Sequence, residues 1–335
     1  MNKTLTGEDH LAYKSVREGV GWYRITSESA FEMSGKDAVS FLQGMVSNDV
    51  KSLKEGTGCY AACLTPTGKM LSDLRIYALA DRLLVLLPRK EKGKILEHLD
   101  KFIFTEEVLF KDLESEADLF SFQGPLSQKL LRDFVEDPLV LDPYQHRAFE
   151  REGIPFRVFG ATHTGENGFD MWVSKKESLR LCELIQEMGR SYGIREINAE
   201  VLEVLRIEAS LPLYGIDMDE STIPLEAGLE TAVNFTKGCY VGQEVIARIK
   251  YIGHTNRVLI GLKLSEAVSK GDQVVQDGRE VGSITSSCYS PAQHSYVALA
   301  MMRRDIAKKE AVLMVKAERG FQQAILTSLP FYARH

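Results

Sequence analysis

The sequence predicts an α+β fold in which antiparallel strands alternate with helices, followed by a small all-β domain. Two observations support this prediction. First, strand-like segments follow one another through short turns such as 65–68, Thr-Pro-Thr-Gly, with amphipathic helices between them. Second, the helical patterns stop after Arg248, and only short strands with hairpin signals follow. Strands joined by hairpins favour an antiparallel sheet over a doubly wound α/β sheet.

From residue 22 to about residue 131 the hydrophobic pattern switches between a period of two and a period of 3.6, which indicates strands and helices in turn. The first of these helices is expected to begin at Ser34, because serine is a good N-cap residue. The expected strands are 22–26, 30–33, 58–64, 69–79 and 83–87, with two more near Val108 and Leu119. The expected helices are 34–46, 92–102 and one through Leu130 and Leu131.

The same alternation continues through the middle of the chain. A strand at 156–159 leads through a tight loop at 162–168 into a half-buried strand at 169–173. A helix is expected at 179–188, and another at 199–209 behind an Asn198 N-cap.

Short strands dominate the last part of the chain. They are expected at 256–264, 273–275, 281–285, 296–302 and 311–315. Asp277-Gly278 is a strong hairpin signal, and the regular spacing predicts a small barrel or sandwich. We therefore divide the chain into a first region, residues 1–250, and a C-terminal β-domain, residues 251–335.

The composition indicates an ordinary globular protein, with 44% hydrophobic and 26% charged residues. A formal net charge of -6 argues against a broad nucleic-acid-binding surface, so no direct nucleic-acid partner is expected. No apolar run approaches the ~20 residues of a membrane helix, and the N-terminus lacks the apolar core of a signal peptide. Five scattered cysteines favour reduced thiols over a disulfide framework. A soluble, cytoplasmic protein without membrane contact is expected.

The segment 237–248, Lys-Gly-Cys-Tyr-Val-Gly-Gln-Glu-Val-Ile-Ala-Arg, concentrates special residues before a predicted amphipathic helix. Cys239 lies about four residues before that helix, with Lys237 beside it. A helix N-terminus and a nearby cation both favour the thiolate, so a reactive cysteine is one interpretation. The other interpretation is a small hydrophobic side chain buried in a core.

Asp73 interrupts an apolar strand just after the turn at 65–68. A carboxylate in such a strand needs polar partners or a raised pKa, so Asp73 can act as a general acid or base, or hold a cationic amine. The alternative is a residue at the end of a strand that accepts hydrogen bonds from turn amides.

Glu166 lies between Gly165 and Asn167-Gly168, which places it at the exposed tip of a loop. A carboxylate there can accept two hydrogen bonds from the N3–H and 2-amino groups of a pterin. The alternative is a solvated glutamate in a turn.

Two weaker patterns do not support a nucleotide or metal site. The glycine pattern at 56–61 follows a polar lead-in and is closed by Pro66, unlike a dinucleotide-binding turn. Cys59 and Cys63 are two ligands short of a structural zinc site, so no metal site is predicted.

Taken together, these segments resemble the folate-binding superfamily of the glycine-cleavage T-protein, an aminomethyltransferase. The resemblance extends from about Gly21 to the end of the chain. It is carried by residues 35–38, 41–43 and 47–50, by the Thr-Gly-Glu-Asn-Gly-Phe-Asp loop at 164–170, by 208–209, 212–220 and 224–229, and by 280–286, 289–291 and 297–300. It implies three lobes around a central hole, two interleaved α+β lobes within residues 1–250 and a β-barrel.

The resemblance also implies a cofactor, tetrahydrofolate or a one-carbon derivative of it. Glu166 would bind the pterin, Asp73 would lie near the reactive nitrogens, and the strip from Arg248 to Lys250 would be available for the glutamate tail. The candidate catalytic residues are Cys239 and Asp73. The candidate cofactor-binding residues are Glu166, Asp73, Asn48, Gln243 and Arg248, and the motif residues are Lys237, Gly238, Cys239, Tyr240, Gly242, Gln243 and Glu244.

The motif at 237–244 is similar to the signature of YgfZ-like proteins, which form one branch of this superfamily. Aminomethyltransferases usually have Phe-Ile-Gly-Arg-Glu there, with no cysteine and with arginine in place of Gln243. They also tend to have paired aspartates where this chain has Ser72-Asp73. The resemblance to this branch implies a tetrahydrofolate-binding protein that supports iron–sulfur cluster assembly or repair and, through it, tRNA modification. Its partners would be iron–sulfur proteins or cluster-assembly factors.

Two other functions fit the same residues. One is a folate-dependent aminomethyltransferase or methyltransferase. The other is a non-catalytic adaptor that senses folate.

Overall fold

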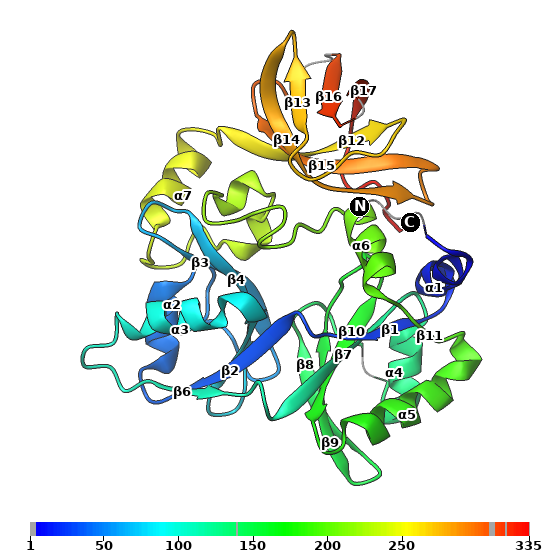
Figure 1. The fold of residues 1–335 in the computed structure, drawn as a ribbon. Coiled ribbons are helices and arrows are strands. Elements are labelled where there is room, and N and C mark those ends of the chain that lie inside the picture. The colour runs from blue at the N-terminus through cyan, green and yellow to red at the C-terminus, as the bar shows by residue number, and fades with distance from the viewer. Residues whose placement is uncertain (1–4, 139, 308–311, 319, 335) are drawn as a thin grey trace.

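The computed structural model describes residues 5–138, 140–307, 312–318 and 320–334, and these form three lobes (Figure 1). Two lobes are built on sheets of five and six strands with helices, and the third is a closed six-stranded β-barrel. The predicted α+β fold with a C-terminal barrel is therefore confirmed. In the ranges just given, no helix is both long enough and apolar enough to cross a bilayer.

The first lobe is an antiparallel sheet in the order β3-β4-β5-β2-β6, with two helices packed on one face. Leu74 and Ile76 of β4 share a buried cluster with Phe41 of α2 and Ile95 of α3. Because side chains alternate along a strand, residues 73 and 75 point from the opposite face. The elements are β2 (Glu28–Ser34), α2 (Ala38–Met45), β3 (Gly58–Leu64), β4 (Met70–Ala78), β5 (Leu83–Pro88), η1 (Arg89–Glu91), α3 (Lys92–Asp100) and β6 (Leu109–Asp112).

The second lobe is a sheet in the order β11-β1-β7-β10-β9-β8. Its strand β1 precedes the first lobe in sequence, so the chain starts in the second lobe, builds the first and then returns. Strand β1 is antiparallel to β7 and parallel to β11. The elements are β1 (Gly21–Arg24), β7 (Ala117–Gln123), α4 (Ser127–Val135), β8 (His146–Arg151), β9 (Ile154–Gly160), β10 (Gly168–Ser174), α5 (Ser178–Gly189), η2 (Arg190–Tyr192) and β11 (Arg195–Glu196).

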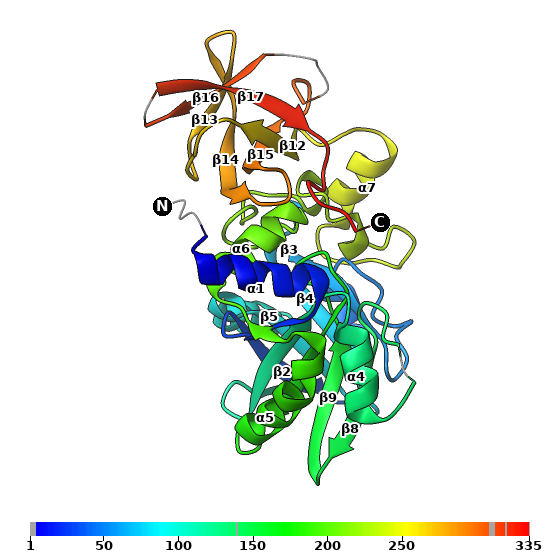
Figure 2. The same ribbon diagram turned by 90° about the vertical axis from the view of Figure 1, so that its right-hand side faces the viewer.

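Helices α1 (Gly7–Glu18) and α6 (Ala199–Glu208) lie between the second lobe and the barrel (Figure 2). Val16 of α1 and Leu205 of α6 share a buried cluster with Leu299 of the barrel and with Phe331. The barrel closes in the order β12-β15-β14-β13-β16-β17. The remaining elements are η3 (Pro224–Glu226), η4 (Glu230–Ala232), α7 (Gln243–Tyr251), β12 (Arg257–Leu264), β13 (Gln273–Gln276), β14 (Arg279–Ser290), β15 (Ser295–Arg303), β16 (Leu313–Ala317) and β17 (Gly320–Thr327).

Several local expectations differ from the structure. The predicted helix start at Ser34 is wrong: Ser34 ends β2, and α2 begins only at Ala38, because the left-handed backbone of Gly35 (φ +109°) intervenes. Helix α1 and strands β8, β11 and β17 were not expected. Residue 311 of the expected strand at 311–315 lies outside the described residues, and β16 begins at Leu313. The Asn198 cap is confirmed, since its side chain accepts a hydrogen bond from the Val201 amide.

Candidate functional site

Asp73 lies on the face of β4 that points away from α2 and α3. Its Oδ2 accepts a 2.8 Å hydrogen bond from the Tyr60 hydroxyl on the neighbouring strand β3. Its Oδ1 is shielded from solvent and has no hydrogen-bond partner in the described part of the chain. Burial raises the pKa of the Asp73 carboxyl, and the Tyr60 hydrogen bond offsets part of that rise. Such a carboxyl can hold a proton and exchange it with a bound molecule.

A network of ion pairs beside Asp73 joins the first lobe to the second. Arg75, on the same face of β4, donates from Nη1 to Oδ2 of Asp170 at 2.7 Å and pairs with Glu28. Asp170 lies on β10 and also contacts Nε2 of His163 at 3.1 Å. Burial by itself would raise the pKa of Asp170, but His163 and Arg75 hold it well below its usual range. The network therefore fixes β4 against β10 at the site.

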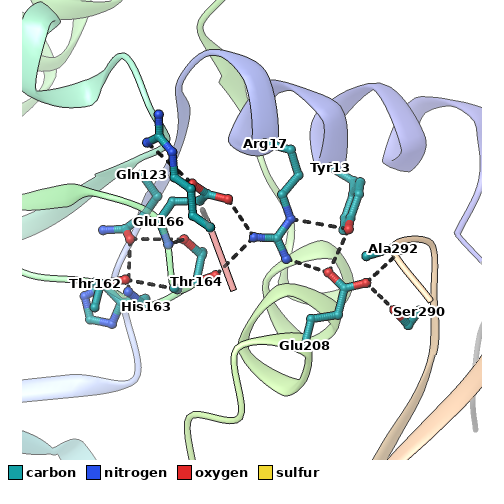
Figure 3. A network of polar contacts seen from close by, with 12 residues as sticks. Tyr13, Arg17, Gln123, Thr162, His163, Thr164, Glu166, Glu208, Ser290 and Ala292 are labelled. Carbon is teal, nitrogen blue, oxygen red and sulfur yellow. Dashed lines mark hydrogen bonds and ion pairs between the residues drawn. The ribbon is translucent and has the colours of Figure 1, made fainter. Parts of the chain in front are cut away.

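Glu166 is buried, with 2% of its surface exposed, although its neighbours Gly165 and Asn167 are exposed. Its Oε1 accepts a 2.9 Å hydrogen bond from Nη1 of Arg17 (Figure 3). Its Oε2 is shielded, has no hydrogen-bond partner among the described residues, and lies 3.8 Å from Nη1 of Arg334. The alternative of a solvated glutamate in a turn was therefore wrong, because α1 and the C-terminal segment cover this side chain with Arg17 and Arg334. Binding of a pterin by Glu166 stays a prediction.

Arg17 connects the Glu166 loop to α6 and the barrel (Figure 3). Its guanidinium forms a second ion pair with Glu208 at the end of α6, and it lies 3.7 Å from the centroid of the Tyr332 ring. The other oxygen of Glu208 accepts a hydrogen bond from the hydroxyl of Ser290, which ends β14. One buried cation thus holds together α1, the second lobe, α6 and the barrel.

Lys237 anchors the motif loop to the first lobe. Its Nζ donates hydrogen bonds to the carbonyl oxygens of Gln43, Val46 and Asn48 at 2.6 to 2.7 Å. Burial lowers the pKa of Lys237 to about 8, and the three carbonyls take all three N–H groups of its ammonium. The structure therefore gives Lys237 a role in fixing the loop, and its predicted influence on the Cys239 thiol stays a prediction.

Gly242 brings the motif loop into close contact with the β3–β4 turn. It is the N-cap of α7 with φ +85°, and a Cβ there would lie 2.6 Å from the carbonyl oxygen of Thr65. A Cβ on Gly68 would in turn lie 2.8 Å from the Cβ of Val245. Both glycines are needed because side chains at these positions would push the loop off the turn.

Tyr240 and Gln243 form contacts within the motif loop. The Gln243 side-chain oxygen accepts a hydrogen bond from the Tyr240 amide at 3.2 Å. The Tyr240 ring lies 5.0 Å from the Nζ of Lys237 and packs on a buried cluster that also includes Tyr60. The predicted motif is therefore a structural unit in which Gly238, Cys239 and Glu244 remain exposed.

Cys239 is exposed, which does not fit the alternative of a small side chain buried in a core. Of the other cysteines, Cys63, Cys182 and Cys288 are buried and Cys59 is half-buried. No group of three or more His, Cys, Asp or Glu side chains could hold a metal ion within the described ranges. The loop therefore presents one thiol to solvent on a fixed backbone.

Asn48 and Arg248, two further predicted cofactor-binding residues, lie in different surroundings. The side-chain nitrogen of Asn48 donates to the carbonyl oxygens of Tyr60 and Thr231, which places it next to the tyrosine that holds Asp73. Arg248 is exposed on α7, and no hydrogen bond or ion pair among the described residues joins it to Asp73. The structure thus places Asn48 against the backbone of the tyrosine that binds Asp73, and it does not bring Arg248 to them.

Several residues at this site were not expected from the sequence. Arg17 lies on α1, whose start is marked by the Thr6–Asp9 capping box, a signal visible in the sequence. Arg75 could have been found from strand alternation, because it is two residues from Asp73 on β4. No local signal indicated His163, whose contact depends on the neighbouring strand.

Two family models match the chain. Residues 7–237 match the GCVT N-terminal domain, and residues 257–333 match the glycine cleavage T-protein C-terminal barrel domain. The chain belongs to the glycine cleavage T-protein family. Relatives in this family include the aminomethyltransferase of Nostoc sp., which is 30% identical over 334 residues that cover 96% of this chain and 86% of that protein.

A second relative and a solved structure are also similar to this chain over most of its length. The aminomethyltransferase of Thermotoga petrophila is 29% identical over 322 residues, 95% of this chain and 88% of that protein. The solved glycine cleavage system aminomethyltransferase T from Bartonella henselae has a TM-score of 0.85 at 23% identity, over 96% of this chain and 88% of that one, which supports the fold. The T-protein resemblance is thus confirmed, and assignment to the YgfZ-like branch stays a prediction.

Proposed function

We propose that this protein binds a reduced folate near Asp73 and Glu166 and uses it in a one-carbon transfer of the aminomethyltransferase type. The single observation that carries the proposal is the Asp73 carboxyl, which has a raised pKa and a shielded Oδ1 without a hydrogen-bond partner in the described residues. These properties fit a group that transfers a proton to or from a bound ligand. The names of the relatives, all aminomethyltransferases, favour this chemistry over the iron–sulfur role predicted from the motif.

The polar groups around Asp73 and Glu166 fit a tetrahydrofolate. Each carboxylate keeps one shielded oxygen without a hydrogen-bond partner in the described residues. Oε2 of Glu166 lies 3.8 Å from Nη1 of Arg334, whereas Oδ1 of Asp73 has no such cation, and an unpaired buried acceptor costs about 1–3 kcal/mol. A reduced pterin carries N–H donors on its ring edge that would satisfy such acceptors. By the family resemblance, Glu166 would hold the pterin and Asp73 would lie near the reactive nitrogens.

In this proposal the chain's own residues orient the ligand and transfer a proton to or from it, while tetrahydrofolate supplies the nitrogen that accepts the carbon unit. Tyr60 fixes the rotamer of Asp73 through Oδ2 and leaves Oδ1 to take or give the proton. The Arg75–Asp170 pair keeps β4 against β10, so that the position of Asp73 is preserved. Arg17 holds Oε1 of Glu166 through a 2.9 Å ion pair and so orients the carboxylate toward a ligand.

Tetrahydrofolate is expected to bind the wild-type protein and to raise its melting temperature with the logarithm of ligand concentration. Glu166→Gln should weaken this binding at least tenfold in isothermal titration calorimetry, because the amide offers fewer acceptor sites to the pterin donors. The matched control is Glu187→Gln, an exposed carboxylate on α5, which should bind as the wild type does. Absence of binding to the wild type would contradict the proposal, and binding without any turnover would favour a folate-sensing adaptor.

The exposed thiol of Cys239 favours a second candidate function, support of iron–sulfur cluster assembly or repair and, through it, of tRNA modification. Partners in this case would be iron–sulfur proteins or cluster-assembly factors. The support is a solvent-accessible thiol on a loop whose other side chains hold its backbone in place.

Cys239→Ala should leave stability within about 0.5 kcal/mol of the wild type and folate affinity unchanged, because the side chain is exposed. If the second function holds, this variant will fail to complement an iron–sulfur defect in cells that lack the protein. The control is Cys59→Ala, which removes a half-buried thiol whose pKa is raised by burial to about 12. Full complementation by Cys239→Ala would refute the iron–sulfur role.

A further inference from the structure

A second polar site lies where α7 meets the barrel. A cleft of about 210 Å³ opens there, and its lining includes Phe235, Lys250, His254, Thr255 and Arg304. Phe235 precedes the motif loop, Lys250 lies at the end of α7, His254 and Thr255 follow α7, and Arg304 directly follows β15. The cleft is smaller than the ~300–1,000 Å³ typical of sites for drug-sized ligands, so it suits a small molecule or one end of a larger one.

The cleft carries positive charge that the described part of the chain does not neutralise. Neither Lys250 nor Arg304 has an ion pair with a described carboxylate. Arg304 donates from Nη1 to the hydroxyl of Thr255 at 2.9 Å, which fixes its guanidinium and leaves further N–H donors. The Nζ of Lys250 lies 4.7 Å from the centroid of the Phe235 ring, so the ammonium forms a cation–π contact with that ring.

One acidic side chain, Glu230, also lines the cleft, and it is exposed. With His254 neutral, Lys250 and Arg304 together still exceed Glu230 by one positive charge. A guanidinium and an ammonium at one small opening match an anion with two or more oxygens, because the guanidinium binds such groups through paired N–H donors and the ammonium adds a point charge.

We propose that this cleft binds a small oxyanion, a phosphate or a carboxylate pair, with Arg304 and Lys250 as its ligands. Two sources share this chemistry. One is free phosphate, and the other is the γ-glutamyl carboxylates of a folate tail.

The folate-tail source rests on the proposed function, and the position of the cleft is consistent with it. Thr231, next to Glu230 in η4, accepts a hydrogen bond from Asn48 through its carbonyl oxygen. Asn48 also donates to the carbonyl oxygen of Tyr60, whose hydroxyl holds Asp73. The short segment η4 therefore contacts both the cleft, through Glu230, and Asn48, through Thr231. The free-phosphate source does not depend on folate binding.

Calorimetric titrations of the full chain with inorganic phosphate and with γ-linked triglutamate test the proposal. The double variant Lys250→Gln/Arg304→Gln should raise the dissociation constant of the anion that binds at least tenfold. The matched control is Lys90→Gln/Arg195→Gln, which removes one lysine and one arginine charge at exposed positions of the first and second lobes and should leave the dissociation constant unchanged. Far-UV circular dichroism and melting curves verify that both double variants are folded.

The two sources give different outcomes. Binding of phosphate without triglutamate supports the free-anion source. Tighter binding of tetrahydrofolate triglutamate than of the monoglutamate, with the difference lost only in the cleft variant, supports the folate tail. Absence of binding of both anions to the wild type, or an equal loss in both double variants, would overturn the cleft proposal. The proposed function is tested separately, since monoglutamyl tetrahydrofolate should bind the cleft variant as it binds the wild type.

Discussion

Arg17→Met is expected to lower the free energy of unfolding by about 3–5 kcal/mol. The Arg17 side chain is 8% exposed and pairs with two carboxylates, Glu166 and Glu208, whose side chains are fully shielded from solvent. Methionine fills much of the same volume but leaves Glu208 buried without its cation and Glu166 with only the more distant Arg334, and an uncompensated buried charge is strongly destabilising. Urea unfolding at pH 7, followed by circular dichroism, measures the loss.

The matched control for Arg17→Met is Arg180→Met, because Arg180 also pairs with a carboxylate, Glu152, but both side chains are exposed, at 57% and 49%. An exposed pair contributes about 0–1 kcal/mol, so this variant should stay within about 1 kcal/mol of the wild type. Adding Glu208→Gln to Arg17→Met should recover part of the lost stability, since it removes one unpaired charge. A loss below 1 kcal/mol for Arg17→Met alone would show that the buried pairs do not hold the lobes together.

Asp73→Asn is expected to lower the kcat of the proposed one-carbon transfer by about 10²–10⁴-fold, the usual contribution of a general acid or base. Asparagine keeps an oxygen that can accept the Tyr60 hydrogen bond, so the fold should be preserved. The dissociation constant of tetrahydrofolate should change much less than kcat, because the substitution removes the proton and retains the shape. The measurement is the production of methylenetetrahydrofolate from an aminomethyl donor, together with calorimetric titration.

Tyr60→Phe separates the effect of the proton from that of the site's shape. It removes the hydrogen bond that lowers the pKa of Asp73, so that pKa should rise further above its usual value. The limb of the pH–rate profile that follows Asp73 should therefore move to higher pH, with a smaller loss of kcat than for Asp73→Asn. Wild-type kcat in Asp73→Asn would exclude Asp73 as the acid or base of the reaction.

Much of the fold could be predicted because its signals are local. The turn at 65–68, the Asn198 cap and the Asp277-Gly278 hairpin each depend on residues within a few positions of one another. The prediction of a helix start at Ser34 was also based on a local signal, and it was wrong because a second local signal opposed it. A favourable N-cap residue is a weaker constraint than the left-handed glycine that follows it. The pairing of β1 with β11 has no local signal and could not be predicted.

The site could be predicted only in part. The apolar strand around Asp73 indicates a carboxyl with a raised pKa, and the structure shows that rise with Tyr60 as a partner. The burial of the Glu166 side chain could not be predicted, because its cation, Arg17, is 149 positions away in sequence. The anchoring of Lys237 to the first lobe could not be predicted, because its acceptors are carbonyl oxygens, which every residue carries and no pattern distinguishes.

The order in which the chain enters its lobes has a consequence for synthesis on the ribosome. Gly21 pairs with Arg195, so β1 emerges long before its parallel neighbour exists, by on the order of 10–30 s at ~5–20 residues per second. The five strands of the first sheet are complete by Asp112, within that interval. The nascent chain is thus expected to fold its first lobe while Trp22 and the apolar side of α1 still lack their packing partners. We expect chaperones to bind these exposed apolar segments during translation.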